Sequence, residues 1–174
     1  MTETTLLYKT VHGSHLYGLA HENSDDDFYS VVNTVKKNKI KYAKQSIVDG
    51  IDQMTVDWGT WVNMCQAGVP QALEAMFSQK PLFEAEGIRE FRAAFRMGSQ
   101  ARDRYYRTID NFMAEPDVKK NRHGLRLALN LRDGLKYGYF NPTLTPRQAL
   151  WTTYHAKYTP LDDLREMALG MANA

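Results

Sequence analysis

The order of secondary-structure patterns along the chain most constrains its fold. Segments rich in β-branched and apolar residues come first and predict strands at residues 26–35 and 46–58. Residues 4–11 have a similar composition and predict a first strand, or a helix that leads into one. From residue 58 onward, the apolar residues follow a helical spacing almost to the end. Strands followed by helices indicate an α+β fold.

Capping residues mark where the helices begin and end. Asp57 and Asp117 are each expected to cap the helix that follows them, and Gly68 is expected to end the first of these helices. Thr145 and Thr159 each precede a proline, which is the pattern of a cap and a first helical residue. Other helices are predicted at residues 14–20, 69–77 and 87–114, the last as one long helix or two medium ones.

Composition sets the broad class of protein. The formal net charge of +2 neither requires nor excludes nucleic acid as a partner. Cys65 is the single cysteine, so the chain can form no internal disulfide and no cysteine-based metal cluster. No apolar run reaches the length of a membrane span, and residues 1–14 lack the pattern of a secretory signal. We therefore expect a soluble, cytoplasmic protein without a membrane partner.

Three consecutive aspartates lead into the strand predicted at 26–35. In strand geometry Asp25 and Asp27 point to the same face, about 7 Å apart, and Asp26 points away. A divalent cation such as Mg²⁺ binds oxygen ligands of this kind and offsets their mutual repulsion. A third carboxylate on a neighbouring strand would complete a two-metal site, and Asp52 is the first candidate, with Asp57 as the alternative.

A glycine and a serine precede the aspartates and suit the binding of phosphate. Gly13 lets the backbone approach a phosphate closely, and Ser14 offers a hydroxyl and a main-chain N–H at the start of a helix. A phosphate-binding turn followed by a metal-binding strand is the combination that a nucleoside triphosphate requires.

These residues resemble the signature of the DNA polymerase β nucleotidyltransferase superfamily. The more detailed resemblance is to a subgroup that occurs in phages and beside RNA-repair ligases and that reads GS-x-x-Y-G-x-x-x-x-x-S-D-x-D-x-x-G-V. The matching positions are Gly13, Ser14, Tyr17, Gly18, Ser24, Asp25, Asp27 and Val31. Ser30 stands where the subgroup has a glycine.

The resemblance continues, more loosely, into the second half of the chain. The subgroup's G-N-P-x-x-x-E pattern is matched by Gly68, Pro70 and Glu74, with Val69 in place of asparagine. Its Lys…His…Arg pattern is matched by Lys119 or Lys120, then His123 and Arg126.

The resemblance implies a small mixed sheet flanked by helices over residues 1–80, the catalytic core, and a helical region over 81–174. It implies transfer of a nucleoside monophosphate from a nucleoside triphosphate to an acceptor hydroxyl, with RNA or tRNA as the first guess for the acceptor. Mg²⁺ or Mn²⁺ would be bound by Asp25, Asp27 and Asp52. The nucleotide would be bound by Gly13, Ser14, Tyr17, Ser24, His123 and Arg126.

Two other functions fit the same residues. The fold also suits an antitoxin-like or regulatory protein that acts by binding a partner. A hydrolase could use the same carboxylates to cut phosphodiesters. The lysine-rich segment 36–45 could bind nucleic acid, and an exposed hairpin is the alternative. The oligomeric state, the base and the acceptor are not determined by the sequence.

Overall fold

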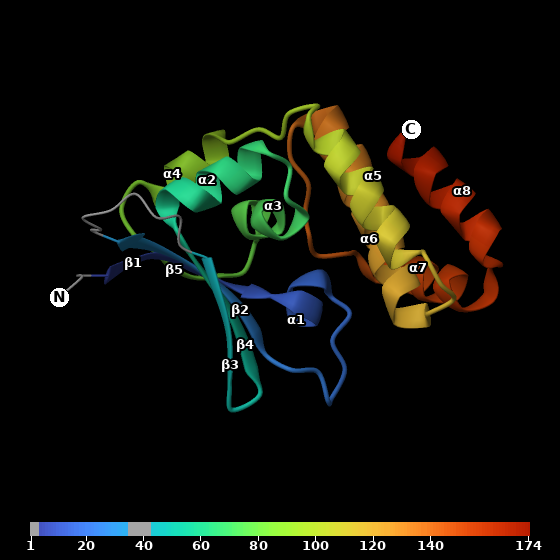
Figure 1. Cartoon of the computed structure of the whole chain (residues 1–174), viewed down its shortest axis with the longest axis horizontal. Coiled ribbons are helices and arrows are strands. Elements are labelled where there is room, and N and C mark those ends of the chain that lie inside the picture. Colours follow the sequence, from blue (N-terminus) through green and yellow to red (C-terminus); the bar gives the residue numbers. More distant parts are fainter. Residues whose placement is uncertain (1–3, 35–42) are drawn as a thin grey trace.

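The protein combines one mixed sheet with a bundle of helices. The structure, a computed structural model, describes residues 4–34 and 43–174. Within these residues it contains five strands and eight helices, which confirms the predicted α+β fold class. Figure 1 shows the sheet with α1 to α4 on one side of the molecule and α5 to α8 on the other. Residues 36–42 of the lysine-rich segment lie outside the described residues.

The sheet has the strand order β3-β4-β2-β1-β5. Its strands are β1 (Thr4–His12), β2 (Asp27–Thr34), β3 (Ala43–Val48), β4 (Ile51–Asp57) and β5 (Pro81–Glu84). β2 and β4 run parallel, and the other neighbouring pairs are antiparallel. Because β2 and β4 run in the same direction, their first residues meet at one edge of the sheet, where Asp27 pairs in register with Asp52.

The prediction of one strand over 46–58 was wrong. Two antiparallel strands, β3 and β4, occupy residues 43–57 and are joined by Asp49 and Gly50. Both of these residues have positive φ, 53° and 76°, which is the backbone of the tight turns that connect hairpins. The Asp-Gly pair in the sequence was the local signal for this turn.

Helices α2 (Trp58–Gln66) and α3 (Pro70–Phe77) pack on the buried face of the sheet. Tyr8 of β1 stacks on Trp61 with 5.5 Å between ring centroids, and its hydroxyl donates to the carbonyl of Ala75 at 2.8 Å. Asp57 caps α2, as predicted, by accepting a hydrogen bond from the backbone N–H of Thr60 at 3.0 Å. The contacts of Tyr8 hold both α2 and α3 against β1.

The turn between α2 and α3 requires a glycine, because Gly68 has φ +74 and its Cα approaches the backbone of Ala101. The other helices of this side are α1 (Gly13–Tyr17) and α4 (Ile88–Ala94). Residues 87–114, predicted as one long helix or two medium ones, form two helices, α4 and α5 (Ala101–Phe112).

Helix α6 (Val118–Tyr137) is the centre of the helical side and packs against α5, α7 (Pro146–Tyr158) and α8 (Leu161–Ala172). Asp117 and Thr145 cap α6 and α7 as predicted. The expected cap at Thr159 was wrong, since α8 begins one residue later and the Thr159 hydroxyl hydrogen-bonds with the His155 ring instead.

One cluster of buried side chains extends from the sheet into the helical side. It includes Tyr8 and Val31 from the sheet and Leu125 and Leu131 from α6. β5 and α4 follow residue 80 and still pack on the sheet side, as Figure 1 shows. The division of the chain at residue 80 stays a prediction. Among the described residues, no helix has both the length and the apolar character that crossing a membrane requires.

Candidate active site

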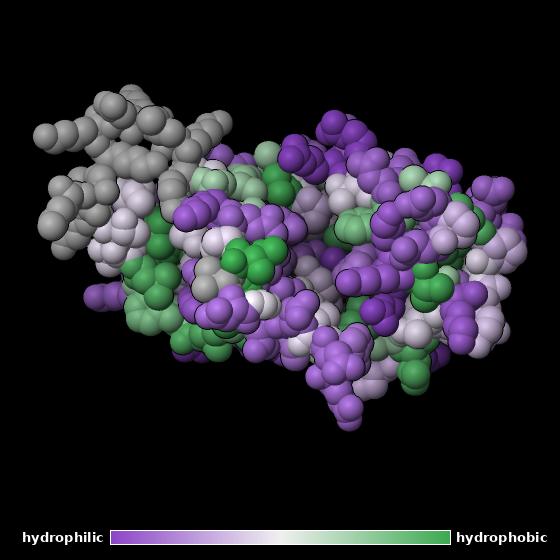
Figure 2. Space-filling model, turned by 60° about the horizontal axis from the view of Figure 1, so that its bottom comes forward, coloured by the Kyte–Doolittle hydropathy of each residue, from purple (hydrophilic) through white to green (hydrophobic). Residues whose placement is uncertain are grey.

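A cleft with a volume of about 1160 Å³ lies between the sheet side and the helical side. Figure 2 shows a hollow between the two halves of the molecule, with hydrophilic side chains around it. The cleft brings together every residue that the sequence predicted for metal or nucleotide binding. These residues are Gly13, Ser14, Tyr17, Ser24, Asp25, Asp27, Asp52, His123 and Arg126.

Asp27 and Asp52 form the acidic centre of the cleft. They are register partners at the start of the parallel strands β2 and β4. Gln45 of β3 donates to Asp52 Oδ2 at 2.7 Å, which orients that carboxylate. Asp57 lies at the other end of β4, where it caps α2. The structure therefore places Asp52, and not Asp57, beside Asp27.

Asp25 also lines the cleft, but from the loop before β2. The expectation that Asp25 and Asp27 share one face of a strand was wrong, because the strand begins at Asp27. Burial raises the pKa of the Asp27 carboxyl, and the negative charges of Asp52 and Asp25 raise it further. Asp26 is exposed and lies 3.5 Å from the His15 ring, outside the cleft lining.

Gly13 is held against the Asp27 carboxylate. Its φ is +62°, and a Cβ at this position would lie 1.9 Å from Asp27 Oδ2. No other residue type fits here without moving the carboxylate. Ser14 follows in α1, and its hydroxyl makes no hydrogen bond with a described residue. Ser24 shapes the loop before β2 by accepting a hydrogen bond from the His21 N–H at 2.8 Å.

A buried ion pair connects three elements around the cleft. Glu74 of α3 is 1% exposed, and its two carboxylate oxygens accept hydrogen bonds from Arg126 of α6 and from the Tyr17 hydroxyl of α1, each at 2.6 Å. The Arg126 guanidinium also lies over the Tyr17 ring, 3.6 Å from its centroid. These contacts fasten the helical side to the sheet side.

Glu74 was not among the predicted site residues, although it lies inside the family-like pattern. The signal for its role was a single acidic residue within the apolar helix "PQALEAMF". A carboxylate on a buried helix face needs a cationic partner. Which cation it meets, 52 positions along the chain, is decided by the tertiary structure.

His123 lies between two aromatic rings of the cleft wall. Its ring centroid is 5.9 Å from that of Tyr17 and 5.6 Å from that of Phe112. Burial, followed by the charge of Arg126, lowers the pKa of His123 to about 4. The imidazole is therefore neutral near pH 7 and can offer a hydrogen bond but no positive charge.

Positive charge on the helical wall comes from other residues. Arg104 of α5, and Lys119 and Arg122 of α6, line the cleft and make no ion pair with a described residue. Arg122, Arg126 and His12 also line the cleft, and each has one buried nitrogen (Nε, Nε and Nε2) without a hydrogen-bond partner among the described residues. His12 Nε2 lies 3.6 Å from Glu74 Oε2, too far for a hydrogen bond. The unpaired cations of this wall, opposite an acidic edge, favour an anionic ligand.

The carboxylates of the cleft suit a divalent cation in their chemistry. Asp27, Asp52 and Asp25 are hard oxygen donors, and the negative charges of Asp52 and Asp25 help to raise the pKa of the Asp27 carboxyl, a repulsion that a bound cation would offset. Within residues 4–34 and 43–174, no group of three or more His, Cys, Asp or Glu side chains is already arranged to hold a metal ion. The structure places the carboxylates of Asp27 and Asp52 on register partners, and Asp25 lines the same cleft from the loop before β2.

The chain was compared with protein-family models, curated proteins and solved structures. No protein-family model and no curated protein matches the chain. Among solved structures, the chain is similar to a nucleotidyltransferase-like protein from Exiguobacterium sibiricum 255-15, with 10% sequence identity and a TM-score of 0.38. The match covers 97% of this chain and 68% of that one. A likeness at this level carries no conclusion about activity.

Proposed function

We propose that the protein transfers a nucleoside monophosphate from a nucleoside triphosphate to an acceptor hydroxyl. The observation that carries this proposal is the composition of one cleft. It combines the register-paired carboxylates Asp27 and Asp52 with the glycine-serine turn and with the unpaired cations Lys119 and Arg122. The signature around Gly13 and Asp27 supports a place in the DNA polymerase β superfamily, in the subgroup found in phages and beside RNA-repair ligases.

In the proposed reaction, the acceptor oxygen forms a bond to the α-phosphorus and the bond between the α- and β-phosphates breaks. Pyrophosphate leaves with the electron pair of that bond, and the hydroxyl proton passes to solvent. Asp27 and Asp52, with Asp25, would hold Mg²⁺ or Mn²⁺, which neutralises the triphosphate and lowers the pKa of the acceptor hydroxyl when it is bound. Such transfers are catalysed mainly by positioning and by charge stabilisation.

The protein's own groups have separate tasks in this proposal. The Ser14 hydroxyl and the Gly13 backbone receive the β- and γ-phosphates at the turn next to Asp27. Lys119, Arg122 and Arg104 offset phosphate charge from the helical wall. Arg126 and Tyr17 take a positioning role, because Arg126 Nη1 and the Tyr17 hydroxyl are already engaged by Glu74.

RNA, including tRNA, is the proposed acceptor. The chain's resemblance to proteins associated with RNA-repair ligases supports it. The cationic wall of the cleft also supports it, because a polynucleotide acceptor brings phosphates of its own.

The test is transfer of label from α-³²P ATP, CTP, GTP and UTP onto total RNA and total protein, with Mg²⁺ and then Mn²⁺. Wild type is compared with Asp27→Asn, which keeps the shape of the side chain and removes its charge. Asp26→Asn is the matched control, because Asp26 is the adjacent aspartate and lies outside the cleft lining. We expect label on RNA with wild type and Asp26→Asn, and a loss of at least about a hundredfold with Asp27→Asn.

Other results would redirect the proposal. Label on protein would retain the transfer reaction and replace the acceptor. Release of nucleoside monophosphate without labelled product would indicate a phosphodiester hydrolase. No turnover by folded wild-type protein with any of the four nucleotides would favour the antitoxin-like or regulatory function, in which the cleft binds a partner.

A further inference from the structure

A second cavity, of about 730 Å³, lies at the other end of α3. It is formed by the segment that follows α3, by β5, by α4 and by the residues after α6, and it shares no lining residue with the cleft. Its lining includes three arginines and four aromatic residues. The arginines are Arg89, Arg92 and Arg96, and the aromatic residues are Phe77, Phe95, Tyr139 and Phe140.

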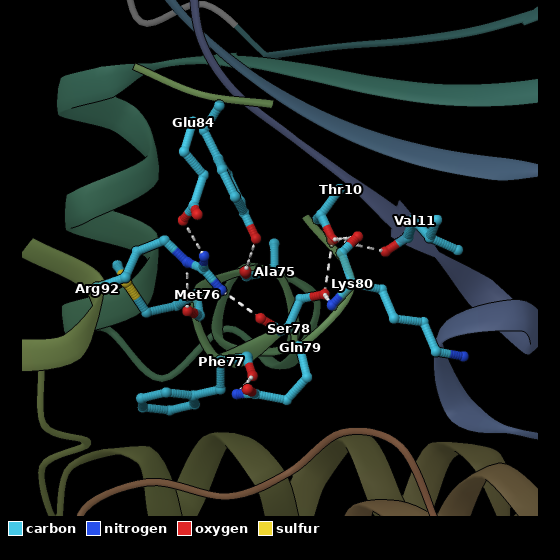
Figure 3. A network of polar contacts seen from close by, with 11 residues as sticks. Thr10, Val11, Ala75, Met76, Phe77, Ser78, Gln79, Lys80, Glu84 and Arg92 are labelled. Atoms are coloured by element: carbon cyan, nitrogen blue, oxygen red, sulfur yellow. Dashed lines mark hydrogen bonds and ion pairs between the residues drawn. The ribbon is translucent and has the colours of Figure 1, made fainter. Parts of the chain in front are cut away.

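Arg92 is fully engaged by the protein. Figure 3 shows its guanidinium between the Glu84 carboxylate and the main-chain carbonyls of Met76 and Ser78. The group also lies over the Tyr8 ring, 4.5 Å from its centroid. Among the described residues, Glu84 is the one acidic residue that lines the cavity, and its carboxylate pairs with Arg92. Arg92 therefore has a structural role in the cavity wall, and its charge is already compensated by Glu84.

Arg89 and Arg96 keep their charges available. Both are exposed, and neither forms an ion pair with a described residue. The Arg96 guanidinium donates to the carbonyls of Ala93 and Phe95 and lies 5.9 Å from the centroid of the Tyr139 ring. The cavity thus carries two uncompensated positive charges at its rim.

The aromatic residues give the same cavity a flat apolar side. Phe77 and Phe140 pack edge to face at 5.0 Å and form its buried part. Tyr139 is 54% exposed, and the equally exposed Tyr137 lies 6.3 Å away, with Lys136 over its ring at 5.2 Å. Exposed aromatic rings next to unpaired cations are the arrangement on which successive bases of a single-stranded nucleic acid stack.

We propose that this second cavity binds a short stretch of single-stranded RNA, with a base stacked on Tyr139 and phosphates paired with Arg89 and Arg96. The proposal rests on the function proposed above only where it identifies this RNA as the acceptor of the transfer. Binding itself needs no catalysis. A site remote from the cleft would hold the acceptor while its reactive end lies near Asp27.

The test is the fluorescence anisotropy of a labelled oligouridylate of about twelve nucleotides, measured without nucleoside triphosphate. The variants are Arg89→Gln/Arg96→Gln and Tyr139→Ala. The matched control is Arg102→Gln/Arg107→Gln, which removes the same charge from exposed positions of α5 outside both cavities. All of these variants are made both in the wild-type protein and in Asp27→Asn. A loss of transfer can then be distinguished from a loss of RNA binding.

We expect Arg89→Gln/Arg96→Gln to weaken binding at least about tenfold and to reduce the salt dependence of log K by about 1.4, as the loss of two phosphate contacts predicts. Tyr139→Ala should weaken it about tenfold, as the loss of one stacked base predicts. The control should change it less than about threefold. Equal losses in control and test variants would overturn the proposal. Uridine monophosphate that competes as well as the oligonucleotide would also overturn it, because the site would then belong to free nucleotides.

Discussion

Replacing Glu74 with Gln removes the charge of the buried pair that fastens the two sides of the cleft. The side chains of Glu74 and Arg126 are 1% and 4% exposed, and the Oε1 to Nη1 distance is 2.6 Å. After the change, the Arg126 guanidinium stays in the interior without a counter-charge. Its Nε already lacks a hydrogen-bond partner among the described residues, so water or protein groups compensate little of the loss.

The expected cost follows from the burial of both partners. Removing one member of a buried ion pair costs about 3 to 5 kcal/mol, because the remaining charge is left desolvated. The Tyr17 hydroxyl keeps an acceptor in the Gln side chain, so its hydrogen bond weakens but is not lost. For a chain of 174 residues, this corresponds to a drop in melting temperature of about 6 to 20 °C.

Urea unfolding of Glu74→Gln, Arg126→Met and the double variant measures this cost. The double variant should lose less than the sum of the two single losses, because no lone charge is then buried. Asp110→Asn is the control. It breaks a pair with Arg165 in which both side chains are more than 40% exposed, so it should cost less than about 1 kcal/mol. A Glu74→Gln cost as small as that of Asp110→Asn would refute the reasoning, and so would additive losses in the double variant.

Two further predictions concern the cleft. Gly13→Ala should abolish transfer and cost more stability than Gly50→Ala in urea unfolding, because both positions have positive φ but only the new Cβ at position 13 meets the Asp27 carboxylate; equal costs would contradict the assigned close approach. His123 is neutral in the folded state, and its pKa is about 4 against an ordinary value of 6.5. The unfolded chain therefore binds a proton first as pH falls, and stability should drop by up to about 3 kcal/mol between about pH 6.5 and pH 4. His123→Phe should remove this part of the pH dependence, and an unchanged profile would show that His123 does not cause it.

Local signals predicted the features that depend on a few adjacent residues. Asp57, Asp117 and Thr145 cap their helices as expected, because a cap needs only the backbone N–H groups of the next turn. β5 was missed, because four residues carry too little periodicity and the strand exists through its pairing with β1. Asp49-Gly50 is a local signal for the turn that divides residues 43–57 into β3 and β4.

The candidate site shows the same contrast. The residue types and spacing from Gly13 to Asp27 were enough to predict six residues that line one cleft, because α1 and β2 are close in sequence and hold those residues together.

The sequence by itself determined the α+β order of elements, the main helix starts and the chemistry of the glycine-serine turn and its aspartates. These properties depend on interactions within one or two turns of chain. Only the tertiary structure decided that Asp52 rather than Asp57 lies beside Asp27, because strand register is set by pairing between distant segments. It also decided that Glu74 meets Arg126 and Tyr17, because a buried carboxylate needs a partner but its own segment does not specify which one.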